Sequence, residues 1–299
     1  MSRTPDGRGP RISLGRRDFV RQAGVGALLA AAAPPTLWAG EKPGPRVSFC
    51  GASLVARFQG YRFGSLAEWA KMEKATVENT DAKEWQAICE DVAGAGFQAM
   101  EVWEAHASPQ RLTSKSVAME WKRIMDGAGL KPVAYAGRLL PETLRICQWL
   151  EIPHVDQGFP NMSPDEATKL CQDHGIRFNL ENHYQKSVAE MLEQIGGGNE
   201  WLGVCVDTGW LGTQGLPGPE VIAELGDLVR HTHIKDVKAV GGHATCLLGE
   251  GVVDPAACIQ ALKDTGYAGW YSWEDEPEDR NPMDSAERNR LWIEKQVSA

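Results

Sequence analysis

Four stretches in the second half of this chain place acidic residues and histidines directly after short apolar runs. They are Leu180-Glu181-Asn182-His183, Val206-Asp207-Thr208-Gly209-Trp210, His231-Thr232-His233-Ile234-Lys235-Asp236 and Trp273-Glu274-Asp275-Glu276. If the carboxylates of Glu181, Asp207 and Glu274 met without a counter-charge, they would repel one another and at least one would stay protonated. A single divalent cation would relieve that repulsion. Because the set is rich in oxygen and has an imidazole, we expect Mn²⁺, with Mg²⁺ or Co²⁺ as alternatives.

Short apolar runs alternate with amphipathic segments along the chain, which is typical of repeated strand-helix units around a parallel sheet. The predicted strands are Val47–Cys50, Ala99–Trp103, Pro132–Ala136, His154–Gln157, Arg177–Leu180, Gly203–Val206, His231–Ile234 and Gly269–Trp273. The predicted helices are Ala82–Ala95, Val117–Gly127, Pro141–Leu150, Pro164–His174, Val188–Ile195, Pro219–Leu225, Pro255–Thr265 and Ser285–Val297. Residues 58–81 are expected to form an irregular insert, either part of a lid or a solvated excursion.

This pattern predicts the α/β class and a single (β/α)₈ TIM barrel. No GxGxxG step follows the first strand, which disfavours a doubly wound nucleotide-binding sheet. In such a barrel the C-terminal ends of all strands meet at one mouth. The four polar stretches follow four consecutive strands, so the fold would bring them together there.

Residues 1–39 have the composition of a twin-arginine-type export signal, with 40–299 left as the barrel. Arg16-Arg17 precede the small apolar run from Ala23 to Ala33, and Ala39 offers a cleavage point. The alternative is an Ala-rich membrane anchor, but the run is too short to span a bilayer. We therefore expect a periplasmic or otherwise exported protein with no stable membrane span in its mature form.

Charge and cysteine content narrow the function further. Removing residues 1–39 changes the formal charge from −9 to −13, which disfavours a nucleic-acid partner. The seven cysteines contain no CxxC pair, so we interpret them as small buried hydrophobes, not as a disulfide framework or zinc cluster.

With these features, the chain resembles the xylose isomerase-like TIM-barrel superfamily, in particular its sugar phosphate isomerase/epimerase branch, which includes the ketose 3-epimerases. The resemblance covers the chain from Val47 onward. It rests on the four stretches above, on Gly249-Glu250-Gly251-Val252-Val253-Asp254 and Gly266-Tyr267-Ala268-Gly269-Trp270, and on the second strand, Met100-Glu101-Val102-Trp103-Glu104-Ala105-His106. One departure is Trp210, where many relatives have a histidine. No basic phosphate pocket is evident either.

The resemblance implies roles for individual residues. The metal ligands would be Glu181, Asp207, His233 and Glu274, and Glu181 and Glu274 would also be the catalytic acid/base pair. Contacts to substrate hydroxyls would come from His183, Lys235, Glu101 and His106. Trp103 and Trp210 lie near strand ends, where an indole can cover the apolar face of a sugar ring.

His231 and His233 share one face of their strand. His233 is nearer the mouth, so we expect it to bind the cation while His231 lies deeper as a hydrogen-bonded structural residue.

The function that these features favour is a metal-dependent sugar isomerase or epimerase, acting by proton transfer next to a carbonyl through an enediolate. The alternative function is a lyase that uses the same metal and base for β-elimination from a 3-keto-glycoside. Export from the cytoplasm favours this alternative. A metal-dependent phosphodiesterase or endonuclease needs more histidines and a basic groove. A non-catalytic exported sugar-binding protein would not need the carboxylates. The expected partner is a small sugar or glycoside, and homo-oligomers occur among relatives.

Overall fold

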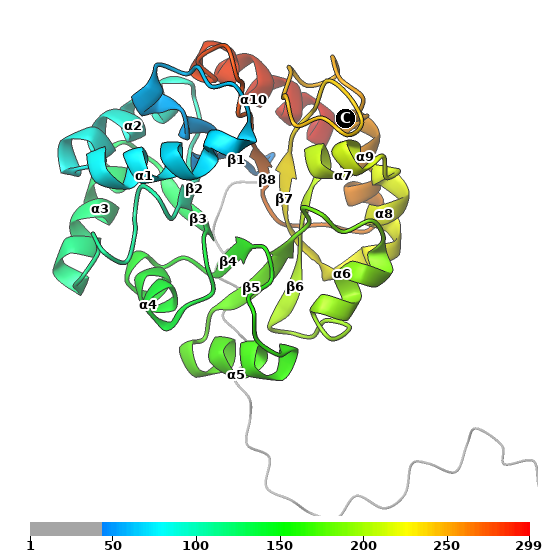
Figure 1. Cartoon of the computed structure of the whole chain (residues 1–299), viewed down its shortest axis with the longest axis horizontal. Coiled ribbons are helices and arrows are strands. Elements are labelled where there is room, and N and C mark those ends of the chain that lie inside the picture. The colour runs from blue at the N-terminus through cyan, green and yellow to red at the C-terminus, as the bar shows by residue number, and fades with distance from the viewer. Residues whose placement is uncertain (1–43) are drawn as a thin grey trace, which may run out of the picture. The chain divides into compact units, whose positions relative to one another are not determined.

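The protein folds into a closed barrel of eight parallel strands in the order β1 to β8, surrounded by helices (Figure 1). The structure is a computed structural model that describes residues 44–299, so the predicted export signal lies outside the described residues. The strands are β1 Val47–Cys50, β2 Ala99–Trp103, β3 Lys131–Ala136, β4 His154–Gln157, β5 Arg177–Glu181, β6 Leu202–Asp207, β7 Val229–Ile234 and β8 Tyr271–Trp273. The predicted fold class, an α/β protein with one (β/α)₈ barrel, is confirmed.

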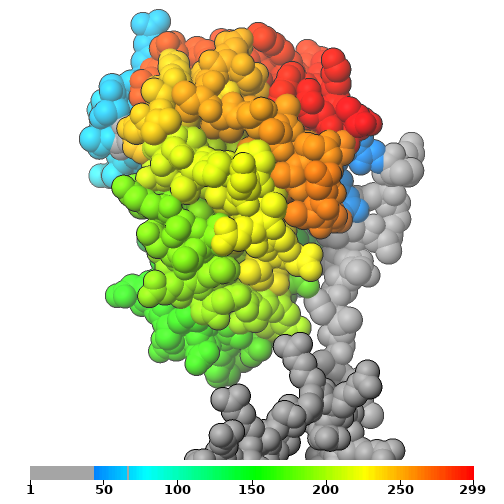
Figure 2. Space-filling model, turned by 90° about the vertical axis from the view of Figure 1, so that its right-hand side faces the viewer, coloured from blue at the N-terminus to red at the C-terminus, as the bar shows by residue number. Residues whose placement is uncertain are grey.

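The structure describes ten α-helices, which pack around the barrel. They are α1 Trp69–Asn79, α2 Ala82–Gly94, α3 Lys115–Gly127, α4 Pro141–Leu150, α5 Pro164–His174, α6 Val188–Gln194, α7 Thr208–Gln214, α8 Gly218–Leu225, α9 Pro255–Asp264 and α10 Met283–Ser298. Eight of these ten helices agree with the sequence prediction within a few residues at each end, whereas α1 and α7 were not predicted. The C-terminal α10 packs beside α9, and Lys263 donates to the Gln296 carbonyl (Figure 2). Within residues 44–299, no helix is both long and apolar enough to cross a membrane.

Local chemistry explains where these helices begin and end. Asp81 caps α2 by accepting the Glu84 amide at 2.8 Å, and Ser163 and Glu166 form a reciprocal capping box at the start of α5. Gly175 ends α5 at φ 66°, a left-handed conformation that favours glycine. These caps fix the residues at which α2 begins and at which α5 begins and ends.

The insert after β1 is more ordered than expected. Residues 58–81 contain the eleven-residue helix α1, so the prediction of an irregular excursion is wrong for this part. Only Met72 and Thr76 of α1 are buried. The other side chains of α1 are exposed or half-buried, so few of them anchor the helix.

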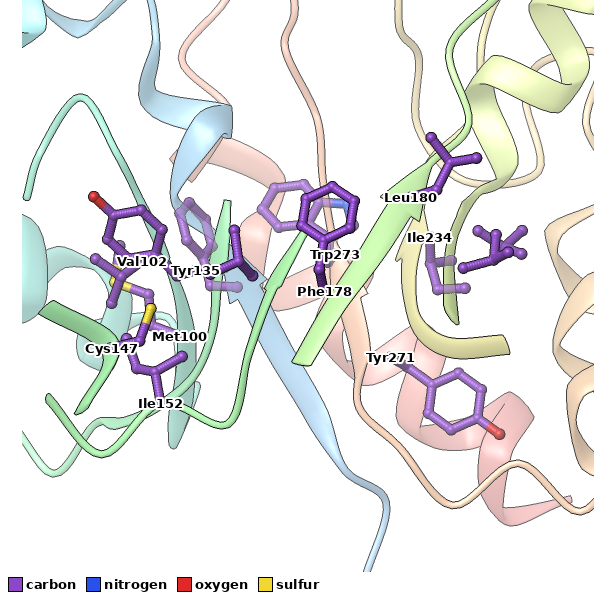
Figure 3. Packing of buried hydrophobic residues seen from close by; sticks show 14 of the residues in the cluster. Met100, Val102, Tyr135, Cys147, Ile152, Phe178, Leu180, Ile234, Tyr271 and Trp273 are labelled. Carbon is purple, nitrogen blue, oxygen red and sulfur yellow. The ribbon is translucent and has the colours of Figure 1, made fainter. Parts of the chain in front are cut away.

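The apolar core lies between the barrel wall and the helices. Figure 3 shows part of it, with Met100, Val102 and Tyr135 clustered near Cys147 and Ile152. All seven cysteines are free and six are buried, as expected of small hydrophobes. By contrast, polar side chains point into the barrel itself, where branched aliphatic residues are usual. Glu101 of β2 reaches across to His231 of β7 there.

Candidate metal centre

The four predicted metal ligands meet at the C-terminal ends of β5 to β8. Glu181 and Asp207 end their strands, His233 is the penultimate residue of β7, and Glu274 follows β8. Their donor atoms all lie within 4.8 Å of one another, and all four side chains are buried. Asp207 and His233 are direct partners in the β6–β7 register. Barrel closure thus brings together residues that are 93 positions apart at most.

The spacing of these donors fits a single cation. His233 Nδ1 lies 3.0 Å from Glu181 Oε1, 3.3 Å from Glu274 Oε2 and 4.0 Å from Asp207 Oδ2. Donors about 2.1 Å from one metal ion stand roughly 3.0 to 3.4 Å apart when they occupy neighbouring coordination positions. Asp207 Oδ2 is buried with no hydrogen-bond partner, while Oδ1 accepts the Trp210 amide at 3.0 Å. An unpartnered buried carboxylate oxygen is expected where a cation belongs.

A buried hydrogen-bond network holds the imidazole of His233. Its Nε2 lies 2.9 Å from Glu101 Oε2, which also contacts His231 Nε2 at 2.9 Å and accepts from Ser272 Oγ at 3.0 Å. A carboxylate behind a metal-binding histidine fixes the tautomer that leaves the other nitrogen free for the metal. His231 lies one layer deeper than His233, with no exposed surface, as hypothesised from the strand register.

Two predicted substrate contacts are placed elsewhere by the structure. Glu101 is fully buried and does not line the cavity, so it supports His233 instead of facing a substrate. His106 is also fully buried, between Thr80 Oγ1 at 3.2 Å and the Gly51 carbonyl at 3.3 Å. Burial lowers the pKa of His106 to about 3, so it is neutral. The residues of the second strand indicated that both side chains lie near the barrel mouth, but they did not indicate how deeply each is buried.

The electrostatics of the centre reflect an excess of negative charge. Burial, with Glu274 and Glu181 nearby, raises the pKa of Asp207 to about 7. Despite burial, Lys235 and His233 lower the pKa of Glu274 to about 2. Burial likewise opposes charge on His233, yet neighbouring acidic groups raise its pKa well above the ordinary value. Without a cation, the site therefore retains protons that a bound metal would displace.

Lys235 supplies the positive charge next to the quartet. Its Nζ lies 2.6 Å from Glu276 Oε2, 3.2 Å from Glu274 Oε2 and 3.5 Å from Asp207 Oδ2. Burial raises the pKa of Glu276 to about 8. The sequence contains Glu276 in the last polar stretch, but two residues beyond Glu274 it had no predicted role.

A cavity of about 540 Å³ opens above the centre. Glu181, His233 and Glu274 reach its wall, whereas Asp207 lies fully buried beneath it. Four of the six predicted substrate contacts line it: His183, Lys235, Trp103 and Trp210. His183 Nε2 lies 3.4 Å from Glu181 Oε1, and its ring packs edge-on against Trp210 at 5.1 Å.

Several cavity residues were not predicted. Trp210 also packs against His243, with ring centroids 4.6 Å apart, and His243 comes from the long connection between β7 and α9. Trp69 and Glu73 come from α1, while Glu104 and Arg138 follow β2 and β3. Glu104 directly follows the second strand, so its place at a strand end was a signal available in the sequence. No comparable signal identified Trp69 and Glu73, because the helix that contains them was not predicted.

Comparisons with known proteins agree with this fold. Residues 163–296 match the family described as xylose isomerase-like TIM barrel. A segment of 72 residues is 36% identical to mannonate dehydratase from Oceanobacillus iheyensis, and the match covers 22% of this chain and 21% of that protein's length. The resemblance to the xylose isomerase-like superfamily is therefore confirmed.

Solved structures extend the likeness to most of the barrel. One is an L-ribulose 3-epimerase, with a TM-score of 0.58 and 16% identity over 85% of this chain and 95% of that chain. Another is the probable 3-DHS dehydratase AsbF from Bacillus anthracis, with a TM-score of 0.59 and 15% identity over 83% and 98% of the two chains. At these identities the likeness establishes the shared fold.

Proposed function

We propose that the protein is a divalent-metal-dependent sugar isomerase or epimerase that transfers a proton at a carbon next to a carbonyl. The observation that carries this proposal is the cluster of Glu181, Asp207, His233 and Glu274 at the buried end of a cavity large enough for a sugar. A divalent cation held by these four side chains would draw electron density from the substrate carbonyl and stabilise the negative charge that develops there. We propose Mn²⁺ as the physiological ion.

Glu181 and Glu274 carry the proton transfer in this proposal. One carboxylate removes the C–H proton, which leaves the substrate as an enediolate. The other, which takes a proton from solvent, then donates it to the same carbon from the opposite face, giving an epimer, or to the neighbouring carbon, giving an isomer. Lys235 and His233 lower the pKa of Glu274 despite its burial, so that carboxylate is ionised.

The other cavity residues orient the substrate. His183 and Lys235 present nitrogen donors beside the reacting carboxylates, where they can bind sugar hydroxyls. Trp103 and Trp210 supply indole surface to opposite sides of the cavity wall, from β2 and α7. Together these side chains would hold the carbon that loses its proton near both glutamates.

The test is hydrogen exchange in D₂O. Purified protein supplied with Mn²⁺ or Mg²⁺ is incubated with free ketohexoses, and mass spectrometry follows deuterium incorporation while chromatography follows epimers and aldoses. We expect metal-dependent incorporation together with a new sugar. Exchange that persists in excess chelator, or no exchange with either metal across the ketohexoses, would contradict the proposal.

Elimination is the second candidate, and a specific contact favours it. The Lys235 ammonium lies 3.2 Å from Glu274 Oε2, so it could protonate an oxygen that leaves as the carboxylate removes the proton from the adjacent carbon. The electrons of the C–H bond would form the new double bond as the C–O bond breaks. The same incubations would then yield a product lighter by one water in place of an epimer, and an incubation with a 3-keto-glycoside would release its aglycone.

The place of action is also a proposal. The paired arginines and Ala-rich run of residues 1–39 support export in a folded state. Expression of the full chain, followed by separation of periplasm from cytoplasm, tests it: replacement of Arg16 and Arg17 by Lys should leave the protein in the cytoplasm.

A further inference from the structure

The cavity has a second half that the metal centre does not use. The quartet lies on β5 to β8, whereas the opposite wall is built over β2 and β3 and by α1 (Figure 1). This wall, which we call the distal wall, consists of Trp69, Glu73, Trp103, Glu104 and Arg138. Proton transfer at the quartet requires none of these five side chains except as a surface for the substrate.

The size of the cavity exceeds the needs of a single sugar. A hexose has about 12 non-hydrogen atoms and fills roughly 200 Å³ at the packing density of protein interiors. The cavity measures about 540 Å³. A hexose bound at the quartet would therefore leave room for a second ring against the distal wall.

The chemistry of the distal wall suits a sugar ring better than an apolar group. Trp69 and Trp103 meet edge-to-face, with ring centroids 5.8 Å apart. Trp103 is only 5% exposed, so the half-buried Trp69 provides most of the aromatic surface for the C–H face of a pyranose. Arg138 binds Glu104 through Nε at 3.0 Å and through its backbone amide at 2.7 Å. This ion pair holds the Arg138 guanidinium and the Glu104 carboxylate in the same wall as the two indoles. Hydroxyl groups of a bound sugar could form hydrogen bonds with either group.

Glu73 adds an uncommitted carboxyl group. It is half-buried in the cavity wall, yet it forms no hydrogen bond or ion pair with any other residue in the range 44–299. Burial and the charge of Glu104 raise its pKa. A ligand hydroxyl would give this group the partner that the protein does not.

We infer that the substrate is a disaccharide-sized glycoside, whose reacting ring lies at the metal quartet and whose second hexosyl ring binds the distal wall. This inference rests on the proposed function only for the placement of the reacting ring. It excludes a free monosaccharide as the preferred ligand. A purely apolar aglycone would leave Glu73 without a hydrogen-bond partner in the complex.

Binding without turnover tests the inference. Calorimetry with the mature, metal-loaded protein would compare trehalose, maltose, cellobiose and lactose with glucose and galactose. We expect at least one disaccharide to bind ten times more tightly than either hexose. In Trp69→Ala and in Arg138→Ala, this disaccharide-to-hexose ratio should fall by about fivefold or more. The matched control is Arg145→Ala, which removes another arginine paired with a glutamate, but on the outer surface of α4; its ratio should not change.

Hexoses that bind as tightly as every disaccharide would overturn the inference, as would no detectable binding across the panel or an unchanged ratio in both variants. If Trp69→Ala is unstable, Trp69→Leu removes the aromatic face with a smaller loss of volume. The D₂O exchange assay separates the two proposals. Exchange without a disaccharide preference refutes only the distal subsite. A disaccharide preference without exchange on any ketose, disaccharides that contain a ketose included, refutes only the proton-transfer function.

Discussion

The carboxylate behind His233 offers a test of the metal centre that leaves all four proposed ligands in place. Glu101 Oε2 contacts three donors: His231 Nε2, His233 Nε2 and Ser272 Oγ. The two imidazoles lower the pKa of Glu101 despite its burial, so the group is ionised. Glu101→Gln keeps the volume and one acceptor oxygen but removes the charge.

The expected cost follows from those three contacts. A hydrogen bond to a charged group is worth about 1 kcal/mol more than one between neutral groups, so the substitution should lower the free energy of unfolding by about 3 kcal/mol. Oε1 is also buried without a partner, so an amide nitrogen placed there would remain unpaired. Loss of a carboxylate behind a metal-binding histidine typically weakens metal affinity by roughly 10- to 100-fold.

The measurements are urea denaturation of chelated protein and Mn²⁺ titration by calorimetry, each compared with the unsubstituted chain. Glu142→Gln is the matched control, because Glu142 is exposed and pairs only with Arg145. It should change the free energy of unfolding by less than about 0.5 kcal/mol and leave Mn²⁺ affinity unchanged. A Glu101→Gln protein with unaltered Mn²⁺ affinity would refute the role of Glu101 in holding His233.

Three further predictions concern the quartet itself. Glu181→Gln and Glu274→Gln should each lower turnover by orders of magnitude while circular dichroism shows a retained fold; near-normal turnover in either would remove that residue from the acid/base pair. His233→Ala should lose bound metal and the effect of chelator on melting temperature, whereas His231→Ala should stay metal-loaded; the reverse result would exchange their roles. In metal-free protein, Asp207 with its pKa of about 7 and His233 with its raised pKa hold more protons when folded than when unfolded. The contribution of Asp207 is lost between about pH 4 and 7 and that of His233 above about pH 6.5, so stability falls as pH rises from 6 to 8, by up to about 1.4 kcal/mol per pH unit and group. Denaturation of chelated protein should show this fall, and saturating Mn²⁺ should offset it; chelated stability that rises over this range would contradict the assigned protonation.

The barrel could be predicted because each strand is marked by its own residues. Five predicted elements have the same bounds in the structure: Val47–Cys50, Ala99–Trp103, Pro141–Leu150, His154–Gln157 and Pro164–His174. Strand-end positions also located the quartet, since closure of the barrel brings those ends together without any information about side-chain contacts.

Two features could not be predicted from the sequence. They are how deeply individual side chains are buried, and the helices α1 and α7. Glu101 and His106 lie on a strand and just beyond its end, as cavity residues do, but whether such a side chain reaches the cavity depends on layers of packing across the barrel. Helix α1 follows an irregular stretch and buries only two side chains, and α7 is seven residues long with two internal glycines, so neither helix was predicted from the sequence. The residues that α1 adds to the distal wall were missed for that reason.

The most direct test of the metal centre is the position of the ion. Crystals of the mature protein grown with Mn²⁺ would be measured at a wavelength where manganese scatters anomalously. We expect one strong anomalous peak about 2.1 to 2.3 Å from an oxygen of Glu181, of Asp207 and of Glu274 and from Nδ1 of His233. A peak elsewhere in the barrel, or no peak from protein that shows metal-dependent activity, would contradict it.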